Sequence, residues 1–265
     1  MMFEESFEIS LEKLSSRPEI LSQLAYPSQR SDYAQTILNE LKEMDVESIY
    51  LTYQPRPTLK FIGKGYRGIV IKARWRSKVI AGKILRTDSG IPSLNREAEM
   101  TRIANSIGIG PRVFDYSGHV ILMEYIEGRD LDEWLDELPP DKVCILRKVL
   151  TAIMAQAGKL DSISLDHGEL SNARRHIVVK NDLTPTILDF GKARISRKPK
   201  NLTSITSYIT RGPHHLKILK MLDVCNLPIH LLRAYKENPS QENFKKILGE
   251  LNLVDECSQK ATLEV

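Results

Sequence analysis

The chain has 265 residues; 42% of them are hydrophobic, 27% are charged, and the formal net charge is +4. This composition is ordinary for a soluble globular protein, and no apolar run approaches the roughly 20 residues that a membrane-spanning helix needs. The acidic first residues, MMFEESFEISLEKL, contain no apolar core, which argues against a secretory signal.

The predicted elements begin with a helix and a strand and then become β-rich. A helix is expected over residues 31–44, where apolar residues recur at helical spacing, and SIYLTY (48–53) follows as a strand. QPRPT (54–58) is expected to be a stiff boundary. Further elements are predicted in this order: the strands LKFIG (59–63), GIVIKARW (68–75) and KVIAGKIL (78–85), the helix SLNREAEMTRIANSI (93–107), and the strands RVFDYSG (112–118) and HVILMEYI (119–126).

The rest of the chain is predicted to be mostly helical. The helical stretches are DLDEWLDEL (130–138), KVCILRKVLTAIMAQAGKL (142–160), HLKILKML (215–222) and ENFKKILGEL (242–251). A β-rich front joined to an α-rich back predicts an α+β fold with a cleft between its two parts.

The first motif is the glycine run GKGYRGIV, which places Gly63, Gly65 and Gly68 before Val70. Such a run is weak evidence by itself, because glycines are common in turns. A dinucleotide-binding fold would continue as a helix, whereas residues 68–75 alternate as a strand. Two strands joined by a glycine loop are typical of a loop that covers nucleotide phosphates, which the backbone can approach closely where no Cβ intervenes.

The second motif is a lysine inside an apolar strand, Lys83 in VIAGKIL. A buried ammonium is costly unless it reaches water or an anion. Lys83 is therefore either an edge-strand lysine that extends to solvent or a phosphate-binding group. Glu97 and Glu99 on the following helix are its candidate partners, and both can equally be exposed helix acids.

Two short motifs follow, HGEL (167–170) and LDFGKA (188–193). Asp189, expected at the end of a strand, is a hard carboxylate suited to Mg²⁺ that bridges phosphates. A DFG triplet alone arises by chance. Preceded by a glycine loop, a strand lysine, a helix glutamate and HGE, in that order, it is strong evidence for phosphoryl-transfer chemistry.

In this order the motifs resemble those of compact atypical protein kinases, such as the RIO kinases, the small kinase subunit of the KEOPS complex and predicted archaeal serine/threonine kinases with an HGE loop. The resemblance covers about residues 59–195. It implies a kinase-like two-lobed fold with a reduced C-terminal lobe, because few residues follow the DFG motif and no APE motif occurs. We expect an N-terminal α/β extension at 1–55, a small β-rich lobe at 56–127 and a mostly helical large lobe at 128–265.

The resemblance implies ATP and either Mg²⁺ or Mn²⁺ as cofactors. The three glycines and Val70 would cover the nucleotide, and Lys83 would contact its phosphates. The stretch REAEM is similar to the REA element of compact kinases, which favours Glu97 over Glu99 as the partner of Lys83.

The stretch MEYIEG (123–128) resembles a kinase hinge. Glu124, Tyr125 and Ile126 would then bind the adenine edge through their backbone groups, and Met123 would limit access to the rear of the pocket. A strand end followed by a turn is the alternative interpretation.

Two positions of the catalytic loop depart from the resemblance. Glu169 stands where such loops carry an Asp that orients the acceptor hydroxyl. The longer Glu side chain can still accept a proton if its backbone lies further back. In the alternative interpretation, the site binds nucleotide but does not transfer phosphate. Arg174 stands where a metal-binding Asn is expected, and Asn172 is near that position but early.

The register of the next hairpin suggests another metal-binding residue. If IVV and TIL pair around KNDLTP with Ile177 opposite Leu188, His176 lies opposite Asp189. His176 then occupies the Asn-like position, where its imidazole would suit Mn²⁺ better than Mg²⁺. A phosphate contact or a structural hydrogen bond is the alternative role for His176.

The three cysteines, Cys144, Cys225 and Cys257, are odd in number and far apart. They form no metal-ligand spacing, so we expect reduced thiols in a cytoplasmic protein. The basic run GKARISRKPK (191–200) is either a solvated loop or a contact surface for RNA or a ribonucleoprotein. The hydroxyl-rich stretch NLTSITSYITRG (201–212) is expected to be an exposed loop and a target of autophosphorylation.

These motifs lead us to expect an ATP-dependent phosphotransferase, namely an atypical serine/threonine protein kinase that acts on a protein acceptor. Glu169, Lys83 and Asp189 would be its catalytic residues. Two alternatives stay open: a small-molecule or sugar kinase on the same fold, and a non-catalytic nucleotide-binding pseudokinase in a ribonucleoprotein assembly. No membrane association is expected.

Overall fold

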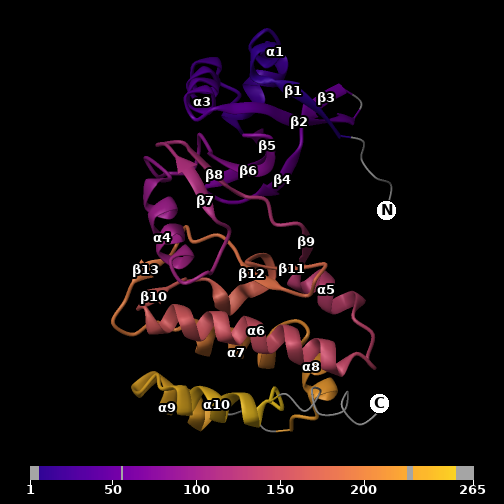
Figure 1. The fold of residues 1–265 in the computed structure, drawn as a ribbon, viewed down its shortest axis with the longest axis vertical. Coiled ribbons are helices and arrows are strands. Elements are labelled where there is room, and N and C mark those ends of the chain that lie inside the picture. The colour runs from indigo at the N-terminus through magenta and orange to yellow at the C-terminus, as the bar shows by residue number, and fades with distance from the viewer. Residues whose placement is uncertain (1–5, 55, 226–228, 255–265) are drawn as a thin grey trace. The chain divides into compact units, whose positions relative to one another are not determined.

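The computed structural model describes residues 6–54, 56–225 and 229–254 (Figure 1). Its contacts divide the chain into two units, the first made of residues 1–102 and 111–125, the second of residues 103–110 and 126–265. An antiparallel sheet dominates the first unit and helices dominate the second, which confirms the α+β class. The three-part division predicted from the sequence stays a prediction.

Among the described residues, the first unit contains an eight-stranded antiparallel sheet with the order β1-β2-β5-β6-β8-β7, in which β3 also pairs with β2 and β4 with β5. Its strands are β1 (Ser6–Ser10), β2 (Val46–Gln54), β3 (Arg56–Leu59), β4 (Phe61–Lys64), β5 (Gly68–Trp75), β6 (Lys78–Leu85), β7 (Val113–Tyr116) and β8 (Val120–Glu124). The expectation of a stiff boundary at residues 54–58 is wrong, because β3 turns back and pairs with β2. The pairing of β2 with β5 makes the N-terminal segment part of the same sheet as the glycine loop.

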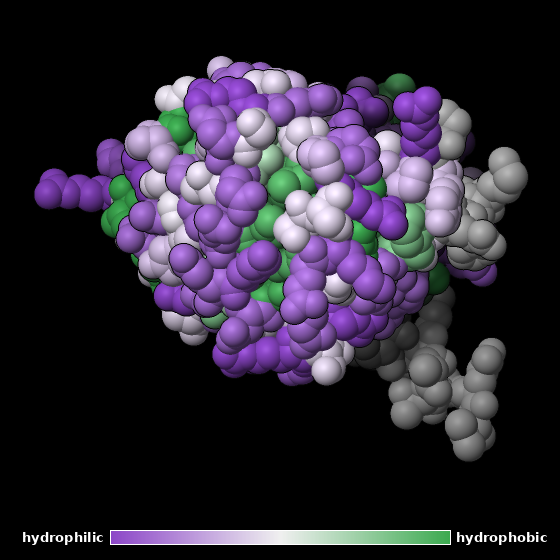
Figure 2. All heavy atoms as spheres, turned by 90° about the horizontal axis from the view of Figure 1, so that it is seen from above, coloured by the Kyte–Doolittle hydropathy of each residue, from purple (hydrophilic) through white to green (hydrophobic). Residues whose placement is uncertain are grey.

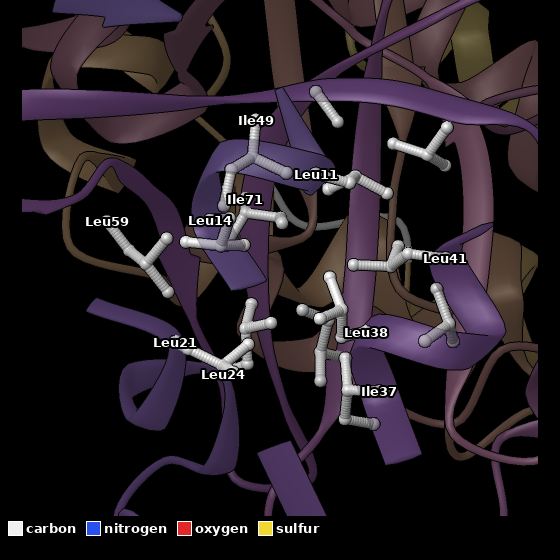
Figure 3. Packing of buried hydrophobic residues seen from close by; sticks show 14 of the residues in the cluster. Leu11, Leu14, Leu21, Leu24, Ile37, Leu38, Leu41, Ile49, Leu59 and Ile71 are labelled. Carbon is white, nitrogen blue, oxygen red and sulfur yellow. The ribbon is translucent and has the colours of Figure 1, made fainter. Parts of the chain in front are cut away.

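Short N-terminal helices pack on one face of this sheet. They are α1 (Leu11–Ser15), α2 (Pro18–Leu21), the 3-10 helix η1 (Ser22–Ala25) and α3 (Ser31–Glu43). Ile37, Leu38 and Leu41 share one face of α3 and pack with Ile49 and Ile71 of the sheet in a single buried cluster (Figure 3). The surface on which α1 and α3 lie is mostly hydrophilic, with a limited apolar area near the middle of the view (Figure 2). The N-terminal segment therefore turns its apolar side chains inward and its polar ones to solvent.

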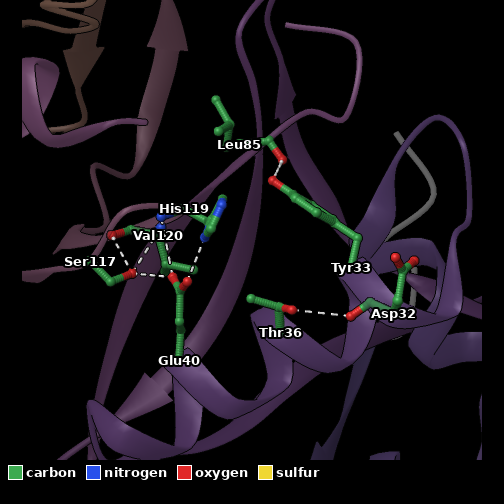
Figure 4. A network of polar contacts seen from close by, with 8 residues as sticks. All are labelled: Asp32, Tyr33, Thr36, Glu40, Leu85, Ser117, His119 and Val120. Atoms are coloured by element: carbon green, nitrogen blue, oxygen red, sulfur yellow. Dashed lines mark hydrogen bonds and ion pairs between the residues drawn. The ribbon is translucent and has the colours of Figure 1, made fainter. Parts of the chain in front are cut away.

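A polar network also fastens α3 to the turn between β7 and β8 (Figure 4). Glu40 on α3 accepts the backbone N–H of His119 at 3.2 Å and contacts His119 Nδ1 at 2.5 Å. The hydroxyl of Ser117 donates to the same carboxylate. About two turns earlier on α3, Tyr33 donates its hydroxyl to the Leu85 carbonyl at 2.9 Å.

Alternation along β6 decides which side chains face away from this N-terminal cluster. Ile80 and Ile84 belong to the cluster, so Lys83 points to the opposite face, as successive strand residues do. Val70 lies directly opposite Lys83 on the neighbouring strand. The sheet thus has one closed apolar face and one face that presents the predicted phosphate-binding lysine.

In the second unit, two short antiparallel sheets lie among helices. The helices are α5 (Leu131–Glu137), α6 (Val143–Ser162), α7 (Asn201–Arg211), α8 (His215–Leu222), α9 (Ile229–Glu237) and α10 (Gln241–Glu250). The strands are β9 (Gly128–Asp130), β11 (Ile177–Lys180) and β12 (Pro185–Ile187) in one sheet, and β10 (Leu165–Asp166) and β13 (Arg194–Ile195) in the other. Strands of two or three residues are too short to show a period in the sequence, which is why β9, β10 and β13 were not predicted. The remaining helix, α4 (Asn95–Asn105), belongs to the first unit through Arg102.

Two sequence-based expectations are wrong in this unit. Residues 201–211 form α7, not an exposed loop, and Thr203, Thr206, Tyr208 and Thr210 are buried in it. The expectation of autophosphorylation depends on these hydroxyls being exposed, so it loses its basis.

The second concerns the cysteines. Cys144 is disulfide-bonded, so the expectation of reduced thiols is wrong at this residue, and the argument from cysteines to a cytoplasmic protein loses its support. Cys225 is free and exposed, and Cys257 lies outside the described residues. None of the helices in the described part of the chain has both the length and the apolar character to cross a bilayer.

Candidate active site

The first unit contains a buried ion pair between β6 and α4. The ammonium of Lys83 lies 2.5 Å from Oε1 of Glu97, and the two residues are 5% and 6% exposed. Glu97 is in the first turn of α4, with its backbone carbonyl accepting the Thr101 hydroxyl at 2.7 Å. Glu99 is exposed on the same helix. The structure confirms the predicted pairing and the choice of Glu97, while the role of the pair toward ATP stays a prediction.

The glycine loop joins β4 to β5 next to this lysine. Gly65 donates its N–H to the carbonyl of Gly68 at 2.8 Å, which closes the turn. A Cβ on Gly68 would lie 3.0 Å from Cε of Lys83 and 3.0 Å from the carbonyl of Ile84. A side chain at position 68 would therefore crowd the lysine stem and the Ile84 carbonyl. This is a local packing reason for glycine, in addition to any role in covering phosphates. Gly63 pairs with Val70 across the two strands.

The predicted hinge lies where the chain passes from the first unit to the second, since Tyr125 ends one and Ile126 begins the other. Glu124 closes β8, and its N–H donates to the carbonyl of Arg112 at 2.8 Å. This amide is committed to the sheet, so an adenine edge would have to use other backbone groups of residues 124–126. Lys72 lies 4.8 Å from the centre of the Tyr125 ring.

In the second unit, the HGE motif follows β10 in a tight backbone conformation. Gly168 has φ of +85°, and a Cβ there would lie 3.1 Å from the carbonyl oxygen of Lys192. Glycine is the residue that adopts such a φ without strain. The carboxylate of the next residue, Glu169, is 2.8 Å from the ammonium of Lys192. The proposed proton acceptor therefore has a cation beside it. Sequence reasoning missed this contact because it considered the basic run only as a solvated loop or a contact surface.

His167 connects HGE to the strand that precedes DFG. Its Nε2 lies 2.9 Å from the carbonyl oxygen of Leu188 and its ring packs edge-on against Phe190, with centroids 5.0 Å apart. A carbonyl oxygen only accepts, so Nε2 carries the proton. Burial lowers the pKa of His167 below its ordinary value, although the hydrogen bond to Leu188 opposes this shift. His167 is thus a neutral structural link between the two motifs.

A buried carboxylate that sequence reasoning missed supports the same loop. Asn201 accepts the N–H of His167 at 2.8 Å and donates its Nδ2 to Asp161 at 2.8 Å. Asp161 also accepts the backbone N–H groups of Asn201 and Leu202, at 3.0 and 3.1 Å, and so satisfies the N-terminus of α7. Burial raises the pKa of Asp161, and these hydrogen bonds oppose the increase.

Asp189 has a left-handed backbone, with φ of +63°, which Asp tolerates better than most residues. Its Oδ1 accepts the N–H of Gly191 at 3.3 Å. Phe190 is fully buried behind it, and a Cβ on Gly110 would lie only 2.8 Å from the Phe190 ring, so a glycine is needed at position 110. This packing fixes the direction of the DFG turn.

The predicted register of the β11–β12 hairpin is wrong by one residue. Ile177 lies opposite Ile187, and the N–H of Leu188 donates to the carbonyl of His176 at 2.8 Å. His176 is therefore opposite Leu188, not Asp189. The cause is a three-residue loop: Asp182 accepts the N–H of Thr184 at 2.8 Å and Leu183 takes φ of +68°, the usual form of such a hairpin.

The residues proposed for the second metal position lie in a short helix and directly after it. Residues 170–175 form the 3-10 helix η2 (Leu170–Arg175), in which the exposed Asn172 forms a kink. Arg174 is 3.4 Å from Asp132, so this side chain fastens η2 to α5. His176 lies beside the ring of His167, with centroids 5.5 Å apart, and its Nδ1 is buried without a hydrogen-bond partner among the described residues.

These donors fit a metal ion that is held mainly by phosphates. The described residues contain no group of three or more His, Cys, Asp and Glu side chains that would hold an ion by themselves. Mg²⁺ commonly takes one or two protein carboxylates and completes its shell with phosphate oxygens and water. Asp189 can supply such a carboxylate, and the buried Nδ1 of His176 is a nitrogen donor of the kind that Mn²⁺ accepts.

The basic run is partly neutralised. Lys192 pairs with Glu169, and Arg194 is 3.0 Å from the buried Asp166. Arg197, Lys198 and Lys200 are exposed and make no ion pair within the described part of the chain. These last three therefore have no internal ion pair that competes with an external anion.

The chain is similar to a curated protein, the KEOPS complex subunit Bud32 of Pyrococcus abyssi, with 35% identity over 126 residues. The match covers 46% of this chain and 52% of Bud32, so the chain spans about half the length of this relative. No protein-family model matches the chain. The similarity and the α+β architecture together indicate a kinase-like fold and support a relationship to Bud32-like and RIO-like kinase-related proteins.

Proposed function

We propose that this protein is an ATP-dependent phosphotransferase, and specifically an atypical serine/threonine protein kinase. The observation that carries the proposal is the buried ion pair between Lys83 and Glu97 beside the glycine loop. A buried ion pair is weak as a source of stability, because an apolar pair of similar volume is often as stable or more so. An ammonium kept inside the sheet is better explained by an anionic ligand, and the order of the motifs makes that ligand a nucleotide phosphate.

The first unit would hold the nucleotide. Lys83 would contact the phosphates, with Glu97 fixing the direction of the ammonium, while Gly63, Gly65 and Gly68 let the backbone cover them. Val70, on the same face of the sheet as Lys83, would contact the base. Backbone groups of residues 124–126 would hydrogen-bond the adenine edge.

The second unit would supply the groups for transfer. Asp189 would hold Mg²⁺ or Mn²⁺, with His176 or Asn172 as the second protein donor; the ion, when bound, neutralises phosphate charge. The oxygen of the acceptor hydroxyl would bond to the terminal phosphorus of ATP while the bond from that phosphorus to ADP breaks. Glu169 would accept the proton that the hydroxyl loses. The backbone at Glu169 is held by the turn at Gly168, so the longer side chain has a defined origin.

Transfer of the terminal phosphate of labelled ATP tests this proposal. Wild-type protein, assayed with Mg²⁺ and with Mn²⁺, should label a protein acceptor or itself, and Asp189→Asn should abolish the labelling. Labelling of a sugar in place of protein would favour the small-molecule kinase, which the fold equally permits. Absence of labelling in every arm, with nucleotide binding intact, would refute phosphotransfer.

A second candidate function is a nucleotide-binding pseudokinase in a ribonucleoprotein assembly. Two observations favour it: Arg197, Lys198 and Lys200 are exposed and unpaired among the described residues, and the similar protein Bud32 is a KEOPS complex subunit. Binding of RNA that weakens steeply with salt would support it. Neutralising these three residues together should then reduce RNA binding and leave nucleotide binding unchanged.

A further inference from the structure

The proposed proton acceptor has its own cation, supplied by the residue after the DFG motif. The ammonium of Lys192 lies 2.8 Å from Oε1 of Glu169. The Lys192 side chain is 58% exposed, whereas the Glu169 side chain is 22% exposed. The ammonium therefore retains donors that can reach a ligand from solvent while it contacts the carboxylate.

The backbone of Lys192, and not only its flexible side chain, is held against the catalytic loop. With φ of +85° and no Cβ, Gly168 allows the loop to approach the Lys192 carbonyl, which would lie 3.1 Å from a Cβ at that position. The neighbouring Ala193 donates its N–H to Phe190 at 2.9 Å, which closes the turn after Asp189. The origin of the lysine side chain is thus set by the same turn that sets Asp189.

The other cations of the basic run do not share this placement. Arg194 is bound to the buried Asp166 at 3.0 Å, on the adjacent strand pair. Lys198 and Lys200 have no carboxylate partner among the described residues. A pair as exposed as Lys192 and Glu169 contributes little to stability, about 0–1 kcal/mol. A stabilising role does not explain why this one cation lies at the proposed proton acceptor.

We propose that Lys192 is a further catalytic residue, which contacts the terminal phosphoryl group of ATP and at the same time orients Glu169. This inference rests on the proposed function. An ammonium carries three N–H donors, so one can stay on Glu169 while the others bind phosphoryl oxygens. As the bond to ADP breaks and the bond to the acceptor oxygen forms, charge on the equatorial oxygens is stabilised by a fixed cation. Lys192 keeps its proton throughout, and the acceptor proton goes to Glu169.

The test compares Lys192→Met, Lys192→Arg and the matched control Lys198→Met in the full chain. Lys192→Met keeps most of the length of the side chain but removes the ammonium, and should lower kcat by ~10²-fold, the usual effect of removing one positioned donor. Lys192→Arg keeps the charge and should retain part of the activity. Lys198→Met, in the same basic run, should behave as wild type. Both positions are exposed, and circular dichroism would verify that all three variants fold.

A second readout does not depend on turnover. ATP and ADP differ by the terminal phosphoryl group, so wild type should bind ATP more tightly than ADP even with EDTA present. Lys192→Met should lose most of this preference, whereas Lys198→Met should keep it. Titration of the two nucleotides at equilibrium measures the ratio directly.

The outcomes separate the two proposals. If wild type transfers phosphate and Lys192→Met stays within about twofold of it in kcat and in the ATP-to-ADP ratio, the role of Lys192 is refuted and the proposed function stands. A loss of kcat with an unchanged ratio also refutes the phosphoryl contact. If wild type binds ATP but transfers no phosphate, the proposed kinase activity is refuted. The ATP-to-ADP affinity ratio then still tests the contact between Lys192 and the terminal phosphoryl group. If wild type binds no nucleotide, both proposals fail.

Discussion

His167 donates its Nε2–H to the carbonyl of Leu188 at 2.9 Å, and this bond ties the HGE loop to the residue between β12 and Asp189. The ring is fully buried, and burial lowers its pKa below the ordinary value of 6.5. Nε2 donates to this carbonyl in either protonation state, so the cost of protonation comes from placing a charge in a buried site and not from loss of the bond.

Stability should depend on pH through His167. Its pKa is lower in the folded state, so below about pH 6.5 the unfolded chain binds a proton that the folded chain does not, and stability is lost as the pH falls toward the folded pKa. Thermal unfolding between pH 7.5 and 5 measures this loss. His167→Gln, whose amide can still donate to a carbonyl, should unfold at a lower temperature at neutral pH and show a weaker pH dependence. An equal pH dependence in the variant would mean that other groups cause it.

Lys83 and Glu97 should contribute to the free energy of unfolding as a coupled pair. Lys83→Met keeps a similar volume but takes the cation away from the Glu97 carboxylate, and breaking a buried pair costs about 3 kcal/mol or more. The double variant Lys83→Met/Glu97→Leu should recover much of this free energy of unfolding, because neither charge of the pair remains to be buried alone. Denaturant unfolding of the single and double variants gives the coupling energy. The single and the double variant should both fail to use ATP. Turnover at the wild-type rate in either variant would contradict the proposed role of Lys83.

Glu169 should be needed for transfer and not for nucleotide binding. Glu169→Gln keeps the size but removes the proton acceptor, so turnover should fall by ~10²-fold or more. Glu169→Asp should also lose activity, because the shorter stem withdraws the carboxylate from the position at which Lys192 now contacts it. Single-turnover transfer and nucleotide titration separate the two properties. A Glu169→Gln variant as fast as wild type would show that the loop is a remnant in a nucleotide-binding protein.

The contact between Glu40 and His119 should stabilise the docking of α3 (Figure 4). Glu40→Ala removes the acceptor of the His119 N–H and of the Ser117 hydroxyl, and hydrogen bonds to a charged group contribute about 1.5–3 kcal/mol each. We expect a loss of about 2 kcal/mol in unfolding free energy and faster hydrogen exchange in α3. Asp32→Ala, which breaks the exposed pair with Arg30 on the same helix, is the control and should change stability by less than about 1 kcal/mol.

The sequence by itself determined the elements that carry a clear period and the motifs placed on them. GIVIKARW and KVIAGKIL alternate apolar residues and form β5 and β6 as predicted. These periods are local, so a few residues of sequence suffice to predict them. The choice of Glu97 over Glu99 as the partner of Lys83 came from the resemblance of REAEM to the REA element, and the ion pair bears it out.

The tertiary structure decided what depends on a turn or on burial. A three-residue loop at Asp182 shifted the hairpin by one residue and moved His176 from opposite Asp189 to opposite Leu188. Thr206 and Thr210 look like exposed hydroxyls in the sequence, yet each donates to the carbonyl four residues earlier, at 2.8 Å, and is buried. The contact between Glu169 and Lys192 joins residues far apart in the chain. No local pattern encodes such a contact, because it exists only where two turns are brought together by folding.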